Sequence, residues 1–178
     1  MIYVFLTNGV EEMEAVAPID LLRRAGVELQ TVGLSGKTVT GSHQIPMLCD
    51  TTASEIDPQD CTGLILPGGP GHIALAQSPI VQDLVKRVAK REGLLAAICA
   101  APSIFGQLGL LRGKQACCYP GFEDQLFGAK VLYKPVVIHD NIITSRGAGT
   151  ATQFALALVT YLAGPKKSAE IARQIQCS

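Results

Sequence analysis

Cys99 stands where the sequence LLAAIC (94–99) changes from apolar residues to the Ala, Pro and Ser of AAPS (100–103). A cysteine at a sharp turn from a strand to a helix has its sulfur held at the edge of a sheet, as in a nucleophile elbow, although the pattern G-x-S-x-G is absent. The amides and the positive end of the following helix favour the thiolate. We therefore predict that Cys99 is a nucleophile. The alternative is a buried structural cysteine, because cysteine is among the most buried residue types.

Two further stretches contain groups that such a nucleophile needs. EEME (11–14) ends in Glu14. Because an ionised carboxylate beside a thiolate raises the thiol pKa, a useful Glu14 is protonated, donates a hydrogen bond to the sulfur and titrates together with it. The glycines of PGGPG (67–71) permit a tight turn whose amides can point at an oxyanion. The alternatives are a solvated acid in the first turn of a helix and an ordinary loop.

The apolar pattern predicts strands that alternate with helices. Expected strands cover 2–7, 27–34, the start of 63–71 and 94–99, with shorter strands within 37–50 and further strands within 130–146. Expected helices cover 12–25, 78–93, 101–109, 149–164 and 166–176. Several strands are apolar throughout, which is typical of a mostly parallel sheet covered by helices on both faces. In the first helix, the residues expected to share one face are Met13, Val16, Ala17, Leu21 and Leu22.

Ligands of such folds bind outside the carboxyl ends of the strands. The loops after Thr7, Leu66 and Ile98 are therefore expected to meet at one edge of the sheet. These loops contain EEME, PGGPG and Cys99.

Length and charge limit the classes of function. The chain has 178 residues, 48% of them hydrophobic, with 15 basic and 15 acidic side chains. It is long enough for one globular domain. We expect neither sequence-specific nucleic acid binding nor membrane association, because no basic patch and no apolar run of about 20 residues is present. The start MIYVFLTNGVEE lacks the basic segment and cleavage site of a signal peptide, so we expect a cytoplasmic protein.

Six cysteines are present, without a C-x-x-C pair or a Cys/His spacing of the zinc type. We expect free thiols, with no disulfide framework and no metal site. Cys117 and Cys118 are expected on a strand that sends their side chains to opposite faces, so that at most one competes with Cys99 for reagents.

Four segments together resemble the ThiJ/PfpI superfamily, in the branch of the parkinsonism-associated protein deglycase (DJ-one) and its bacterial chaperone-like relatives. They are EEMEAVAPIDLLRRAG, LILPGGPG, AAICAAPS and ITSRGAGTATQFALALV. The resemblance covers the chain in order. It implies one ThiJ/PfpI (class I glutamine amidotransferase-like) domain over residues 1–178, with a flavodoxin-like (Rossmann-like) three-layer α/β sandwich, and a homodimer. By motif position, Cys99 is the nucleophile, Glu14 the protonated acid, and Gly69 and Ala100 the amide donors to an oxyanion or sulfinate. No cofactor is implied.

The chain departs from the pattern of that superfamily at three positions. Tyr119 in CCYPGF replaces the histidine of the deglycase, so we expect no Cys-His dyad and a ring that serves as a pocket wall. Ala148 in SRGAG replaces the usual proline. The protease members have a histidine directly after the nucleophile, where this chain has Ala100, so a protease is not expected. His72, directly after the glycine loop, could approach Cys99; the alternative is a polar residue that opens a helix.

Two classes of function stay open from the sequence. In the first, Cys99 adds to the aldehyde carbon of methylglyoxal or of a glycated amino group, loop amides stabilise the alkoxide, and Glu14 moves protons, so that glyoxalase-type or deglycase hydrolysis gives lactate. In the second, Cys99 oxidises to a sulfinate and changes chaperone or partner affinity in a redox-responsive stress protein.

Overall fold

A seven-stranded sheet forms the middle layer of the computed structural model, which describes residues 1–177. The strand order is β10-β11-β7-β6-β1-β2-β5, and every neighbouring pair is parallel except β10 and β11. The strands are β1 (Ile2–Leu6), β2 (Leu29–Gly33), β5 (Thr51–Thr52), β6 (Gly63–Leu66), β7 (Leu94–Ile98), β10 (Val136–His139) and β11 (Ile142–Ser145).

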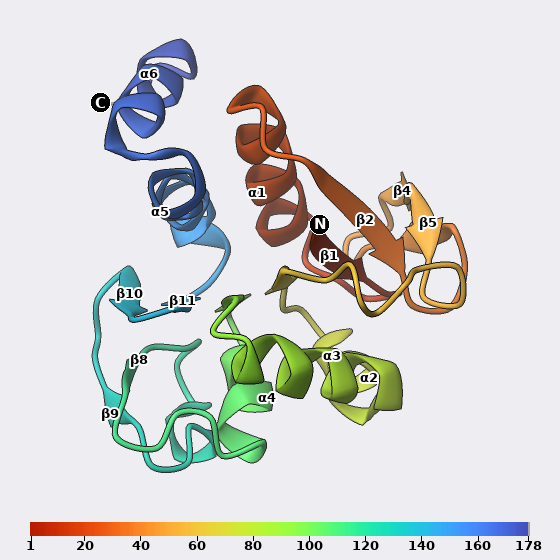
Figure 1. Cartoon of the computed structure of the whole chain (residues 1–178), viewed down its shortest axis with the longest axis vertical. Coiled ribbons are helices and arrows are strands. Elements are labelled where there is room, and N and C mark those ends of the chain that lie inside the picture. The colour runs from red at the N-terminus through yellow and green to blue at the C-terminus, as the bar shows by residue number, and fades with distance from the viewer. Residues whose placement is uncertain (178) are drawn as a thin grey trace.

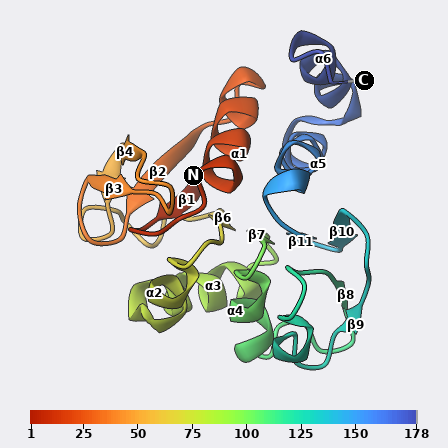
Figure 2. The ribbon, with the colours of Figure 1, turned by 180° about the vertical axis from the view of Figure 1, so that it is seen from behind.

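Helices cover both faces of this sheet (Figure 1). One face has α1 (Glu12–Arg24), α5 (Ala151–Ala163) and α6 (Pro165–Gln174); the other has α2 (His72–Gln77), α3 (Pro79–Lys90) and α4 (Pro102–Gln107). The reverse view separates the same two layers (Figure 2). The predicted three-layer, flavodoxin-like α/β sandwich with a mostly parallel sheet is therefore confirmed.

Short elements complete the chain. The segment 37–50 forms the predicted pair of strands, β3 (Thr38–Thr40) and β4 (Pro46–Leu48), which are antiparallel. A second small sheet pairs β8 (Gln115–Ala116) with β9 (Lys130–Val131), and two 3₁₀ turns lie at Glu123–Gln125 and Ala148–Thr150. Cys117 and Cys118 follow β8 and are both buried.

The central strands are buried on both sides because their side chains alternate between two cores. In β1, Tyr3 and Phe5 join the core beneath α3 and α4, whereas Val4 and Leu6 join the core beneath α1 and α5. This explains why these strands are apolar throughout in the sequence.

The predicted apolar face of α1 is wrong. Leu21 and Leu22 are buried as expected, but Met13 and Val16 are 58% and 50% exposed. The buried side of the helix includes Glu14 in their place. The spacing of apolar residues could not reveal which side of α1 is buried, because that side includes the acidic residue Glu14.

Candidate active site

The three predicted loops do meet at the carboxyl ends of β1, β6 and β7, which are neighbours in the sheet. The first loop leads into α1 and Glu14, the second contains Gly68 and Gly69, and the third begins with Cys99. Contacts between the loops fix their positions. The Glu11 amide donates to the Gly68 carbonyl (3.2 Å), and the Gly71 amide donates to the Gly9 carbonyl (2.9 Å).

Cys99 occupies a left-handed backbone position directly after β7. Its φ of 66° is one that residues with a side chain rarely adopt. Two backbone hydrogen bonds hold this turn, from the Cys99 amide to the Ser145 carbonyl (3.0 Å) and from the Tyr119 amide to the Cys99 carbonyl (2.8 Å). The side chain is half-buried, in contrast with the fully buried Cys117 and Cys118. The geometry is that of a nucleophile elbow, in which a strained turn presents the reactive atom.

Glu14 is the buried carboxyl group of the site, with 1% of the residue exposed. Its Oε2 accepts a 2.9 Å hydrogen bond from the Gly68 amide, and the carboxyl group also forms hydrogen bonds with Cys99 and with the Ala148 amide. Burial raises the pKa of Glu14 to about 7, and the nearby charge of Glu11 adds to this increase. Glu14 is therefore about half protonated near neutral pH.

The sulfur of Cys99 receives hydrogen bonds from the amides of Gly69 and Ala100, the two donors assigned from the sequence. These bonds lower the thiol pKa, but burial and the charge of Glu14 outweigh them and raise it to about 12. The expectation of a thiolate favoured by the helix end is therefore wrong. The helix that follows is only six residues long, and a carboxylate lies beside the sulfur.

Taken together, Cys99 and Glu14 form one coupled acid-base pair. Near neutral pH the pair has lost one proton at most, and the ionised Glu14 is the group that can accept the proton of the thiol. The sulfur of Cys99 is thus held as a thiol near neutral pH, beside a carboxylate that can accept its proton.

Tyr119 and His72 lie at the borders of this site. Tyr119 is 49% exposed, and a Cβ built on Gly147 would lie 3.2 Å from its Cδ2 and 3.8 Å from Oε1 of Glu14. Its ring thus lies beside Gly147 and near Glu14, and its role as a pocket wall stays a prediction. His72 begins α2, its Nδ1 lies 2.8 Å from the Gly69 carbonyl, and its ring packs edge-on against Phe122. The hydrogen bonds of residues 1–177 include none from His72 to Cys99.

Several groups of the site were not assigned from the sequence. Gly68 lies between the two reacting side chains, and Gly147 lies between Glu14 and Tyr119. Glu11 caps α1, since its Oε2 accepts a 2.8 Å hydrogen bond from the Glu14 amide. From the sequence, Gly68 and Gly147 were expected only as parts of the PGGPG and SRGAG loops, without a role of their own. The cap of Glu11 follows from its place before the helix.

One cluster of possible metal ligands occurs among residues 1–177, formed by Glu11, Glu12 and His43. Glu12 already accepts hydrogen bonds from the His43 backbone amide (2.7 Å) and pairs with the His43 ring (2.8 Å). Burial alone would raise the pKa of Glu12, but the bonds to His43 lower it to about 2. We assign the cluster to holding the β3–β4 hairpin against α1. None of the helices in the same range is both long and apolar enough to span a membrane.

Comparisons with known proteins identify the family of the chain. Residues 1–161 match the DJ-1/PfpI family. The chain is 40% identical to Protein dj-1beta of Drosophila melanogaster over 174 residues, which covers 96% of this chain and 93% of that protein. It is 34% identical to the Glutathione-independent glyoxalase DJR-1.2 of Caenorhabditis elegans over 163 residues, covering 90% and 87%. The crystal structure of Drosophila melanogaster DJ-1beta superposes with a TM-score of 0.93 at 38% identity, covering 99% and 97%.

Proposed function

Because the chain belongs to the DJ-1/PfpI family, we propose that it is a cysteine enzyme that uses no cofactor and converts methylglyoxal, free or attached to amino groups, into lactate. The observation that supports this most is the hydrogen-bonded pair of Cys99 and Glu14, with two backbone amides directed at the sulfur. The C. elegans relative that is named a glyoxalase supports the same class of reaction.

The first step of the proposed reaction is addition of sulfur to the aldehyde carbon. Ionised Glu14 accepts the proton of Cys99 while the carbon–sulfur bond forms and the carbonyl electron pair moves to oxygen. The amides of Gly69 and Ala100 donate to the sulfur and stabilise the developing alkoxide beside it. Glu14 then returns the proton to this oxygen, which gives a hemithioacetal.

The second step moves a hydrogen within the bound substrate. Glu14 removes the proton from the former aldehyde carbon and delivers it to the neighbouring keto carbon through an enediol, while the hydroxyl proton of the first carbon passes to the keto oxygen. The first carbon is oxidised by two electrons and the second is reduced by two, so no external oxidant or reductant is needed. The product is a thioester of lactate on Cys99. Water then cleaves the thioester, lactate leaves, and sulfur regains its proton. Tyr119 provides no base for these transfers, because an unperturbed phenol titrates near 10.

The test is lactate formation from methylglyoxal without glutathione. We expect the wild-type chain to form lactate and Cys99→Ala to form none. Cys177→Ala, which removes the other half-buried cysteine, is the matched control and should keep full activity. A wild-type chain that forms no lactate, or a Cys99→Ala variant that retains it, would refute the proposed enzyme.

A second candidate function is redox sensing through the same cysteine. A sulfinate on Cys99 would have hydrogen-bond donors at Gly69 and Ala100, and a protonated Glu14 would supply a third. This function is favoured if lactate is absent while hydrogen peroxide still oxidises Cys99 to a stable sulfinate, as detected by mass spectrometry.

We also propose a homodimer, formed through the exposed side of α1. An open apolar groove there includes Met13, Val16, Ile45 and Met47, and Met13 and Val16 are too exposed for a chain that stays monomeric. Val16→Asp should convert the dimer to a monomer in light scattering, whereas Thr160→Asp, on an exposed position of α5, should not. A wild-type chain that is monomeric at micromolar concentration would contradict this assembly.

A further inference from the structure

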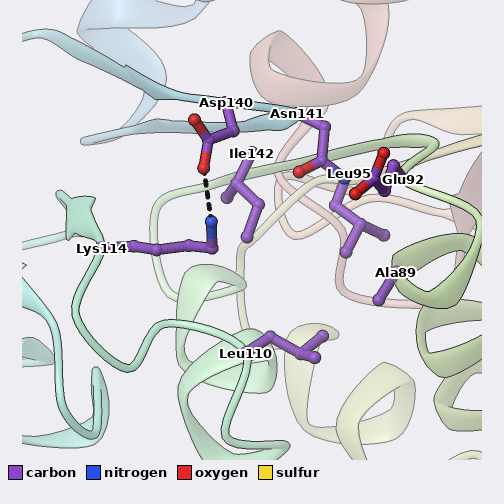
Figure 3. Close-up of a pocket in the computed structure, with 8 residues that line it drawn as sticks. All are labelled: Ala89, Glu92, Leu95, Leu110, Lys114, Asp140, Asn141 and Ile142. Atoms are coloured by element: carbon purple, nitrogen blue, oxygen red, sulfur yellow. Dashed lines mark hydrogen bonds and ion pairs between the residues drawn. The ribbon is translucent and has the colours of Figure 1, made fainter.

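A cavity lies at the opposite end of β7 from Cys99, and the residues that line it are drawn in Figure 3. Its volume is about 530 Å³, within the range of small-molecule sites. Leu95 and Ile142, near the amino ends of β7 and β11, line it, whereas Cys99 follows the carboxyl end of β7. A ligand in this cavity therefore lies on the far edge of the sheet and does not reach the reacting sulfur.

The cavity has an apolar floor and a charged rim. Leu95 and Ile142 are buried, and Leu110 and Ala89 continue the apolar surface. The ammonium group of Lys114 and the carboxylate of Asp140 pair at 2.7 Å on one side of the rim. Asn141 follows Asp140 in the chain, and Glu92 is drawn on the side of Leu95 and Ala89 (Figure 3).

The polar groups of the rim leave an excess of acceptors. Lys114 donates to Asp140, so the one cationic side chain of the lining is already paired. The Asn141 side-chain NH₂ donates to the Gly93 carbonyl at 2.6 Å, which leaves its Oδ1 as an acceptor. The Glu92 carboxylate makes no hydrogen bond or ion pair among residues 1–177. With two carboxylates and one ammonium, the lining has one net negative charge.

The backbone holds these acceptors in fixed positions. The Leu95 amide donates to the Asn141 carbonyl at 2.9 Å, and the Glu92 amide donates to the Ala89 carbonyl at 3.1 Å. Asp140 is fixed in the hairpin turn between β10 and β11. The backbone that carries these acceptors is therefore fixed before any ligand arrives, whereas the exposed side chain of Glu92 is ordered on binding.

We propose that this cavity binds a small organic ammonium ion with an apolar body. The ammonium group is held by Glu92 and by Oδ1 of Asn141, and the hydrocarbon part packs on Leu95, Leu110 and Ile142. An anion would meet two carboxylates in the same space. A neutral apolar molecule would fill the floor but would gain no charge interaction with the Glu92 carboxylate, which is exposed to water.

The experiment is a titration of the full-length chain, followed by the amide resonances of Gly93, Leu95 and Asn141. The probes are phenethylammonium, 2-phenylethanol and phenylacetate, which have the same apolar group and differ in charge. We expect saturable shifts with phenethylammonium and at least tenfold weaker binding of the other two. Glu92→Gln should weaken binding of the ammonium about tenfold. Asp83→Asn, which removes an exposed carboxylate of α3 outside the cavity, should leave it unchanged.

Three results would overturn the proposal. They are the absence of a saturable shift with phenethylammonium, equal binding of the alcohol and the ammonium, and equal binding by wild type and Glu92→Gln. Lactate formation by Glu92→Gln, measured in parallel, reports that the variant is folded and does not depend on the outcome of the titration.

Discussion

The backbone amide of Gly68 donates a 2.9 Å hydrogen bond to Oε2 of Glu14, and no space is left at Gly68 for a side chain. A Cβ there would lie 2.6 Å from the Cβ of Cys99 and 2.8 Å from Oε2 of Glu14. Gly68 is thus the residue whose lack of a side chain allows the acid and the nucleophile to meet.

Gly68→Ala should therefore separate Cys99 from Glu14. A displacement of about 1 Å in a catalytic group costs on the order of 100-fold in rate, so we expect a loss of this size in kcat/KM for methylglyoxal. Gly149→Ala is the matched control, because its Cβ would meet nothing within 4 Å. Equal kcat/KM values for the two variants would show that this contact does not limit the reaction.

Burial of Glu14 makes the chain less stable as the pH rises. Its pKa is raised from 4.5 to about 7, so the folded chain keeps a proton that the unfolded chain releases between these values. Glu14→Gln lacks this titration. We expect the variant to gain about 3 kcal/mol relative to wild type between pH 4.5 and pH 8, in the free energy of unfolding from urea titrations. A difference between the two proteins that does not change with pH would contradict the raised pKa.

Glu11 contributes, after burial, to the pH at which Glu14 becomes a base. It caps the helix through its Oε2, and its charge helps to raise the pKa of Glu14. Glu11→Gln keeps an oxygen for the cap and removes the charge. The midpoint near pH 7 at which turnover rises with pH should move to lower pH, while kcat above the midpoint stays the same. Asp20→Asn, on the same helix, should leave the midpoint in place. If the pH midpoint of turnover is the same in Glu11→Gln and wild type, Glu11 acts only as a helix cap.

Tyr119→Phe should keep most of the turnover, because we expect the ring to act as a wall and not as a base. His72→Ala should also keep most of it, since Nδ1 of His72 lies 2.8 Å from the Gly69 carbonyl and its ring packs on Phe122. Steady-state rates with methylglyoxal, with alkylation of Cys99 by iodoacetamide as a control for an intact site, measure both effects. Loss of nearly all turnover in His72→Ala with normal alkylation would make His72 the base in place of Glu14.

The sequence predicted the layers and the meeting of three loops because both follow from the order of strands and helices. Cys99 was proposed as a nucleophile from its place directly after a strand, and Glu14 as its acid from the position that the family resemblance implies; both roles stay predictions. The direction of the thiol pKa was predicted wrongly, since the helix end is visible in the sequence, whereas burial is a property of the folded chain. The exposed side of α1 was missed for a similar reason: Met13 and Val16 have the same spacing as core residues.

The distant cavity could not be predicted at all. Glu92, Lys114 and Asp140 belong to three separate turns, and no motif links them. They come together only because β7 and β11 are neighbours in the sheet and begin at the same edge.

The most direct test of the account is to quench the reaction with methylglyoxal and map covalent adducts by mass spectrometry. We expect an adduct of one substrate molecule on Cys99 in the wild type. The adduct should form far more slowly in Glu14→Gln, because the amide of Gln cannot accept the proton of the Cys99 thiol. Lactate formation by a wild-type chain with no adduct on Cys99, or with the adduct on Cys177 alone, would contradict covalent catalysis by the pair of Cys99 and Glu14.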